Sequence, residues 1–169
     1  MNMPYAVVDT ARGFVGLAST DGKLSHTTLP KPSRGEALAA LVSAGVTALG
    51  VEDDAAFGGL PGLIRAYFRG EGVDFSGIPL YTSGLAPFHR SVVLALQRIP
   101  HGTLVTYGEL ARIAGSPGAA RAVGNVIARN TTPIVVPCHR VIAAGGRIGG
   151  FSSGLEWKRE LLKLEGVSI

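Results

Sequence analysis

The chain has 169 residues but a single cysteine, Cys138, and this scarcity excludes several kinds of protein. With no second thiol, neither an internal disulfide nor a multi-cysteine metal cage can form. No apolar run approaches the ~20 residues that a transmembrane helix needs. The N-terminal residues lack a basic segment followed by an apolar stretch, so no signal peptide is expected. We therefore expect a soluble protein in the reducing environment of the cytoplasm.

Charge is also scarce, and acidic residues are especially few in the second half. Charged residues make up 17% of the chain and apolar residues 46%, a balance typical of a folded globular protein. Residues 85–169 hold 10 Lys/Arg and 4 Asp/Glu, whereas residues 1–84 hold 6 and 8. A basic patch favours polyanions, because neutralised phosphates release condensed counterions. A solvated basic surface is the simpler alternative, and charge alone favours it.

The first half predicts an antiparallel meander of three short strands, at residues 5–8, 14–18 and 24–29. Ser33 and Glu36 form a capping-box pattern that opens a helix through residue 43. A second helix is expected over residues 60–69, where Gly70 ends it. These elements predict an α/β (α+β) domain over residues 1–78 with a small antiparallel sheet and helices.

The second domain, residues 79–169, follows a linker and is expected to be mostly helical. Helices are predicted over four segments, at residues 87–99, 106–113, 117–129 and 153–165. The second and third of these helices, joined by a turn with glycines, form a helix-turn-helix pattern. Thr106 and Glu109 form a second capping-box pattern, and Ser116 and Ser153 are the expected N-caps of the last two helices.

In the third helix, the side that should face the core carries Ala119, Val123, Val126 and Ile127. Arg121, Asn125 and Ala128 share the opposite face. One charge among small residues suits a helix lying close against a partner, although a solvated surface is the simpler interpretation.

Cys138 lies in the sequence Pro-Cys-His-Arg, directly after the β-branched residues 134–136, which predict a buried extended segment. This setting is typical of a nucleophile with a fixed position, and the alternative is an inert buried cysteine. A thiol has an ordinary pKa of about 8.5, so it needs a proton acceptor near neutral pH. His139 is the obvious candidate. Adjacent side chains on a strand point apart, so contact through a water is expected.

Four motifs stand in order at close spacing: Tyr107, residues 119–125 (Ala-Ala-Arg-Ala-Val-Gly-Asn), residues 128–130 (Ala-Arg-Asn) and the Pro-Cys-His-Arg sequence. Together they resemble the O6-alkylguanine-DNA alkyltransferases, repair proteins that remove alkyl groups from guanine O6. The resemblance covers about residues 85–166. It implies irreversible transfer of the alkyl group to Cys138, once per molecule, with the base flipped out of the duplex from the minor groove.

The resemblance also implies roles for individual side chains. Glu165 would orient His139 in a Cys-His-Glu relay, and Asn130 would act as a hinge. Arg121 would fill the gap left by the flipped nucleotide, and Tyr107 would crowd the 3′ phosphate. Further DNA contacts are expected from Ala119, Ala120, Gly124 and Asn125. The substrate pocket would be formed by Pro133, Val141, Phe151, Ser152 and Ser153.

Simpler structural interpretations exist for the same residues taken singly. His139 could be a core histidine, Tyr107 a half-buried aromatic residue, Arg121 a surface charge and Glu165 a solvated helix end. Two positions also depart from the family pattern: Phe151 replaces a common tyrosine, and Ser153 replaces a common glycine. These departures leave the range of accepted alkyl groups open.

The expected partner is double-stranded DNA containing O6-alkylguanine, with no membrane involved, so the protein would be nucleoid-associated within the cytoplasm. A monomer is expected, and cooperative binding to DNA is left open. No metal or cofactor is expected, because relatives that bind zinc use N-terminal cysteines that this chain lacks. Two other functions compete. A recognition module that binds alkylated DNA without chemistry would lack Cys138, and a cysteine hydrolase would leave the helix-turn-helix unexplained.

Overall fold

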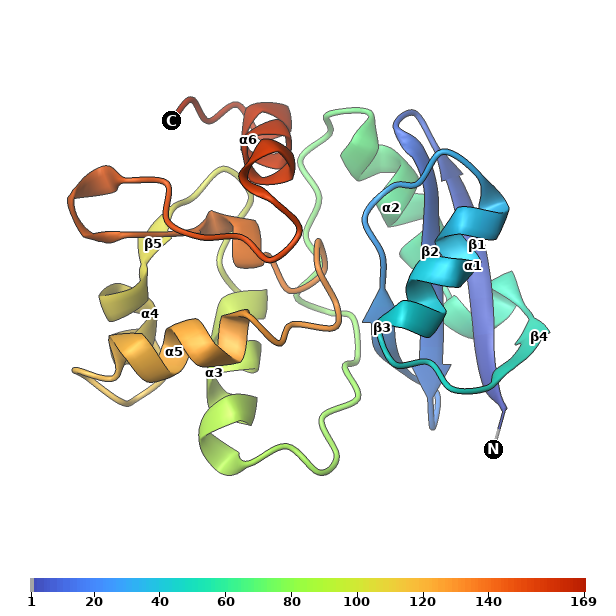
Figure 1. Ribbon diagram of the computed structural model, residues 1–169, viewed down its shortest axis with the longest axis horizontal. Coiled ribbons are helices and arrows are strands. Elements are labelled where there is room, and N and C mark those ends of the chain that lie inside the picture. Colours follow the sequence, from blue (N-terminus) through green and yellow to red (C-terminus); the bar gives the residue numbers. More distant parts are fainter. Residues whose placement is uncertain (1) are drawn as a thin grey trace. The chain divides into compact units, whose positions relative to one another are not determined.

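The computed structural model describes residues 2–169, which form two compact units (Figure 1). The first unit comprises the chain up to Val73 together with Gly77–Ser83 and Thr131–Val135. The second comprises Asp74–Ser76, Gly84–Asn130 and Val136–Ile169. The chain thus passes between the units more than once, and the boundary between residues 78 and 79 stays a prediction. Among the described residues, no helix is long and apolar enough to cross a membrane.

The first unit is built on a four-stranded sheet in the order β3-β2-β1-β4. The predicted antiparallel meander is confirmed by its first three strands, β1 (Met3–Thr10), β2 (Gly13–Thr20) and β3 (Lys23–Thr27). The fourth strand, β4 (Leu49–Glu52), pairs parallel to β1 and was not predicted. Its sequence Leu-Gly-Val-Glu is short and contains a glycine, so it carries almost no strand signal.

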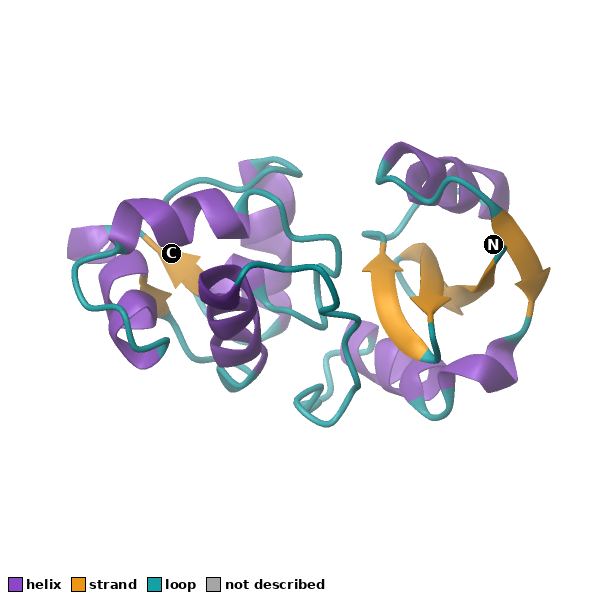
Figure 2. Cartoon of the chain, turned by 90° about the horizontal axis from the view of Figure 1, so that it is seen from below, coloured by secondary structure: helices purple, strands orange, loops and turns teal. Residues whose placement is uncertain are grey.

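Helices lie on both sides of this sheet, as Figure 2 shows. The helix α1 (Arg34–Ser43) packs on β2, and α2 (Leu60–Phe68) packs on β1 after the 3-10 turn η1 (Asp54–Phe57). Gly16 of β2 permits the close approach of α1, because a Cβ atom there would lie 2.9 Å from the Leu41 side chain. With both faces covered, β2 is buried over most of its length, as is typical of a sheet between helices.

The second unit contains four α-helices: α3 (Pro87–Gln97), α4 (Tyr107–Ile113), α5 (Ala120–Ile127) and α6 (Leu155–Leu164). A short parallel pair, β5 (Val105–Thr106) and β6 (Val141–Ile142), joins the segments that lead into α4 and follow Cys138. The predicted helix-turn-helix is confirmed by α4 and α5, and the predicted capping box at Thr106 and Glu109 is formed.

In the structure, two helices begin later than the sequence predicted. Gly118 has a left-handed φ of +83°, and Ala119 precedes the first turn of α5, so Ser116 does not cap this helix. Similarly, Gly154 with φ +97° precedes α6 in place of Ser153. In both cases the glycine adopts a conformation that breaks the helix before the predicted cap can act.

The segment before the cysteine is buried as predicted, but it is not extended. Ile134, Val135 and Val136 are each at most 1% exposed, and they form turns instead of a strand. Ile134 has a φ of +77°, which is a strained conformation for a β-branched residue and costs about 1–3 kcal/mol. The prediction from β-branched composition was therefore wrong here, because tertiary contacts overrode local propensity.

Candidate active site

Cys138 begins a single 3-10 turn, η2 (Cys138–Arg140), and this corrects the prediction that it lies on a strand. The turn forms because the Cys138 amide donates to the Val136 carbonyl (2.8 Å) and the Arg140 amide donates to the Pro137 carbonyl (2.9 Å). Pro137 has no amide hydrogen and a fixed φ, so it favours this bend over a strand ladder. The side chain of Cys138 is consequently held at the wall of a pocket, where the residue is 4% exposed.

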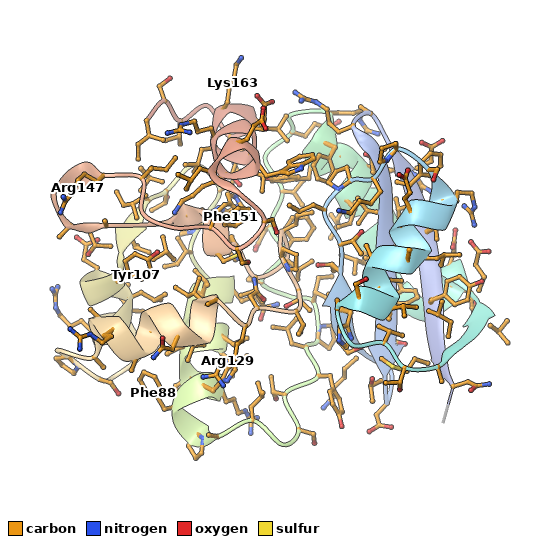
Figure 3. All side chains as sticks on the ribbon, viewed as in Figure 1. Phe88, Tyr107, Arg129, Arg147, Phe151 and Lys163 are labelled. Carbon is orange, nitrogen blue, oxygen red and sulfur yellow. The ribbon has the colours of Figure 1, made fainter. Side chains whose placement is uncertain are left out.

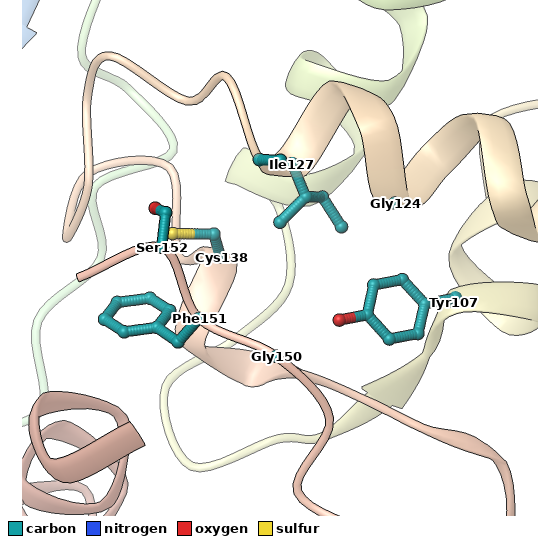
Figure 4. A pocket seen from close by; sticks show the side chains of 8 residues that line it. Tyr107, Gly124, Ile127, Cys138, Gly150, Phe151 and Ser152 are labelled. Atoms are coloured by element: carbon teal, nitrogen blue, oxygen red, sulfur yellow. The ribbon is translucent and has the colours of Figure 1, made fainter. Parts of the chain in front are cut away.

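The pocket has a volume of about 200 Å³ and lies wholly within the second unit (Figure 4). Figure 4 shows the Tyr107 hydroxyl pointing into it from α4, with Phe151 on the opposite side near Cys138. Eight residues line it: Tyr107, Gly124, Ile127, Ala128, Cys138, Gly150, Phe151 and Ser152. The loop before Phe151 lies close to Tyr107 of α4, because a Cβ atom added at Gly149 would lie 3.3 Å from the Tyr107 hydroxyl oxygen. The cavity is therefore mostly apolar, with one thiol and two hydroxyl groups around it.

Behind the cysteine, His139 and Glu165 form a buried pair. His139 Nε2 lies 2.6 Å from Glu165 Oε1, and both side chains are fully buried. Glu165 also accepts hydrogen bonds from the Arg140 guanidinium, at 2.8 and 2.9 Å, and from the Gly102 amide, at 2.9 Å. Burial by itself would raise the pKa of Glu165, but hydrogen bonds from His139 and Arg140 and their charges hold this pKa well below its ordinary value. Glu165 is thus an ionised acceptor.

This carboxylate fixes the protonation pattern of His139. An ionised carboxylate can only accept, so Nε2 carries the hydrogen and, in the neutral ring, Nδ1 carries the lone pair. Burial lowers the pKa of His139 below its ordinary value, although the Glu165 hydrogen bond and charge oppose the shift. The imidazole is therefore neutral at pH 7 and able to take up one proton, which is the state a general base requires.

The thiol itself is protonated in the resting protein. Burial raises the pKa of Cys138, while a hydrogen bond from the Asn130 side chain, the Lys158 charge and the backbone amides of Cys138 and His139 act to lower it. The groups that favour the thiolate are therefore in place around a thiol that burial keeps neutral. The Asn130 amide also donates to the Val136 carbonyl (2.9 Å), which ties the end of α5 to the turn before Pro137.

Lys158 is a buried residue of this site that the sequence analysis missed. Its Nζ donates to the carbonyls of Val141 (2.6 Å) and Gly150 (3.0 Å), and the residue is 0% exposed. Burial lowers its pKa to about 8, with the Cys138 thiolate favouring the charged form. The signal was present in the sequence, because Lys158 lies three and four residues before Leu161 and Leu162, in the apolar stripe of α6. Lys158 thus links β6, which follows Cys138, to the loop that contains Gly150.

The structure brings together part of the predicted pocket and separates the rest. Phe151 and Ser152 line the pocket beside Cys138, whereas Ser153 is exposed outside its lining. Val141 is fully buried on β6, with its carbonyl held by Lys158. Pro133 belongs to the first unit, where its carbonyl accepts a hydrogen bond from Thr27. Three lining residues were missed: Ala128 and Gly150 carry no chemical signal, and Ile127 is an apolar helix residue of the kind that usually faces a core.

The exposed face of α5 matches the predicted pattern. Arg121, Asn125 and Ala128 are exposed, while Val123 and Val126 are buried against the unit's core. Ala119 and Ala120 at the start of the helix are partly buried, and Gly124 faces the Tyr107 ring. Figure 3 shows Arg129 beside the end of α5 and Arg147 on the outer part of the loop before Phe151. The helix therefore presents small residues and one arginine next to the pocket.

Among residues 2–169, no group of three or more histidine, cysteine or acidic side chains is placed to hold a metal ion. The expectation that the protein uses no metal or cofactor stays a prediction.

Comparison with known proteins gives consistent matches. Residues 87–167 match the family model of the 6-O-methylguanine DNA methyltransferase DNA-binding domain. The methylated-DNA–protein-cysteine methyltransferase of Mycolicibacterium paratuberculosis is 41% identical over 165 residues, which are 95% of this chain and 91% of that protein. The Methanosarcina acetivorans protein of the same name is 38% identical over 164 residues, or 97% and 99% of the two chains.

The fold is also similar to solved structures. The crystal structure of Mycobacterium tuberculosis OGT in complex with DNA is 37% identical in sequence and superposes with a TM-score of 0.73. The similarity covers 95% of this chain and 91% of that one. It therefore extends over both units, although the family model matches residues of the second half alone.

Proposed function

The chain belongs to the methylated-DNA–protein-cysteine methyltransferase family of DNA repair proteins, and we propose that it transfers one alkyl group from O6-alkylguanine in double-stranded DNA to Cys138. The observation that carries the proposal is the position of the lone thiol. Cys138 lies at the wall of an apolar pocket, one residue from a buried His-Glu pair. This arrangement follows the general rule of a nucleophile, a base and a group that orients the base.

The proposed step is a displacement at the alkyl carbon. A bond forms between Cys138 Sγ and this carbon while the carbon–O6 bond breaks, and the electron pair of the broken bond stays on O6. The thiol gives up its proton to His139, directly or through a water, and the Glu165 carboxylate stabilises the resulting imidazolium. Guanine takes up one proton at N1 in its ordinary tautomer, and the His139 imidazolium gives up the proton that it received, so the reaction as a whole moves one proton from Cys138 to guanine. Asn130 and Lys158 favour the thiolate as it develops.

The product accounts for a single turnover. A thioether is stable, and the chain has no second cysteine that could resolve it. The described pocket holds no further nucleophile than the serine and tyrosine hydroxyls, which are weak near neutral pH. We therefore expect the protein to be consumed by the reaction.

We further propose that the damaged base leaves the stack to reach this pocket, because a base inside a duplex cannot present O6 to a thiol that is 4% exposed. The small residues of α5 suit a close approach to the minor groove, and Arg121 is the one charge on that face to fill the vacated space. Tyr107 lines the pocket at the start of α4, where it can contact both the base and its flanking phosphate.

The direct test is the substitution Cys138→Ser. Transfer from a duplex with one O6-methylguanine should be abolished, because a hydroxyl is a far weaker nucleophile, while affinity for that duplex should stay within about threefold. Both are measured on the same preparation, by methyl counting and by fluorescence anisotropy. Continued transfer by the variant would refute the assignment of Cys138. Binding without transfer by the wild-type protein would favour a recognition module.

A further inference from the structure

The segment Thr131–Val135 belongs to the first unit, although the chain on either side of it belongs to the second. It follows Asn130 at the end of the α5 region and precedes Cys138 by three residues. The path from the DNA-facing helix to the nucleophile therefore passes through the unit that carries no part of the pocket lining. A connection that stayed within the second unit could join α5 to Cys138 equally well. The passage of residues 131–135 through the first unit therefore calls for a physical explanation.

Three hydrogen bonds hold the segment on the outer edge of β3. The Thr27 amide donates to the Thr131 carbonyl (2.9 Å), and the Thr131 hydroxyl donates to the Ser25 carbonyl (2.8 Å). The Thr27 hydroxyl donates to the Pro133 carbonyl at 2.6 Å. We call these three bonds the β3 clamp. An edge strand normally leaves such groups open to solvent or to other chains, whereas here they hold a specific segment of the same chain.

The segment held by the β3 clamp contains a buried residue with a strained backbone conformation. Ile134, directly after Pro133, is fully buried with a φ of +77°, a conformation that β-branched residues avoid. Such a conformation persists only where the surroundings over-determine it, and it clusters at functional sites. The clamp holds one side of Ile134, and the bond from Asn130 to the Val136 carbonyl holds the other. The bend before Cys138 is thus fixed from both ends.

Resting on the proposed function, we propose that the β3 clamp is a positioning device for the nucleophile. Thr27 and Thr131 hold the strained bend, and the bend sets where the Cys138 thiol stands in the pocket. Few backbone dihedrals lie between Val135 and Cys138, and one of them is fixed in Pro137, so little of a shift in the segment can be absorbed before the thiol. The first unit would therefore contribute to the reaction rate without contacting the substrate.

The test compares two threonine-to-valine substitutions in the same sheet. Thr27→Val removes the hydroxyl bond to Pro133 and keeps the β-branched shape. Thr10→Val removes a hydroxyl bond to the Gly13 carbonyl (2.7 Å) and the bond that this hydroxyl accepts from the Arg12 amide (3.1 Å), both in a hairpin turn. Each variant is treated with O6-methylguanine as the free base and, separately, with iodoacetamide. Because Cys138 is the only thiol, the mass gain in each reaction reports on the nucleophile alone.

Losing one buried hydrogen bond should slow methyl transfer by Thr27→Val roughly two- to tenfold. The same variant should react faster than wild type with iodoacetamide, because a released bend exposes the thiol. Thr27→Ser restores the hydroxyl and should restore both rates. Thr10→Val should change neither rate, even where its melting temperature falls as much. Partial unfolding would also expose the thiol and slow transfer, so the effect of the clamp is the difference between Thr27→Val and Thr10→Val at an equal loss of stability.

Equal rates for Thr27→Val and Thr10→Val in both reactions would overturn the proposal. Should Thr27→Val fail to fold, Thr131→Val carries the same test, since Thr131 is exposed and its carbonyl bond to Thr27 remains. If the wild-type protein accepts no methyl group, the proposed function fails. The iodoacetamide comparison then still decides whether the clamp controls the thiol.

Discussion

At the scale of single residues, burial opposes the charges that the chemistry requires. Burial raises the pKa of Cys138, lowers that of His139 and lowers that of Lys158 to about 8. At pH 7 the thiol and the imidazole are both neutral, Glu165 is ionised opposite Arg140, and Lys158, with its pKa of about 8, is still mostly protonated. The proton transfer that we propose, from the thiol to His139, would create an ion pair next to groups already oriented to stabilise it. A protonated thiol is a weak nucleophile, so we expect the resting protein to react slowly with small alkylating agents.

The buried carboxylate gives a pH dependence with a defined sign. The pKa of Glu165 in the folded protein lies far below its ordinary value of 4.5, so its stabilisation is fully present above pH 4.5. This stabilisation is lost progressively as pH falls below 4.5. Glu165→Gln should lower the free energy of unfolding at pH 7 by about 3 kcal/mol and flatten the acid decline. Urea denaturation between pH 7 and pH 3 measures both effects.

Glu156→Gln on the exposed first turn of α6 is the matched control, and it should keep the wild-type acid slope. An acid slope for Glu165→Gln as steep as that of wild type would show that Glu165 is not the ionised centre of the buried network.

At the scale of elements, the sequence predicted the helices more accurately than the turn at Ile134 that precedes Cys138. Thr106 and Glu109 made α4 recognisable, and the spacing of Val123 and Val126 identified the buried face of α5. Such signals are local, so a single sequence is enough to find them. The turn at Ile134 depends on contacts with β3, which is more than 100 residues earlier in the chain. The β-branched residues 134–136 instead predict an extended segment, and no local signal could have corrected that prediction.

The element-scale prediction concerns the single charge on the exposed face of α5. Arg121→Ala should slow transfer from duplex DNA tenfold or more and leave the reaction with the free O6-methylguanine base unchanged. The reason is that arginine stabilises the flipped state, a contribution of a few kcal/mol, and a free base needs no flipping. Second-order rate constants for both substrates provide the measurement.

Arg159→Ala, an exposed arginine of α6, removes the same charge outside the pocket and the helix-turn-helix and serves as the control. A parallel loss on duplex and free base by Arg121→Ala would instead assign this arginine to folding or to the chemical step.

At the scale of the whole molecule, the two halves of the chain differ in charge, and the chain passes between the two units more than once. The excess of basic residues in residues 85–169 accompanies the helix-turn-helix and the thiol, whereas the first half is slightly acidic. Composition indicated that asymmetry, the Pro-Cys-His-Arg motif pointed to Cys138 and His139, and the family resemblance implied a role for Glu165. The hydrogen-bond partners of Lys158 and the passage of residues 131–135 through the first unit emerge only from the packed structure. Both depend on contacts between segments distant in sequence.

Intact-mass spectrometry can decide whether Cys138 is the final acceptor of the alkyl group. The protein is incubated with an excess of duplex containing one O6-methylguanine. We expect each protein molecule to gain one methyl group, located in the peptide that contains Cys138, and repair to stop at one equivalent. Repair beyond one equivalent, or a methyl group on any other residue, would contradict this assignment.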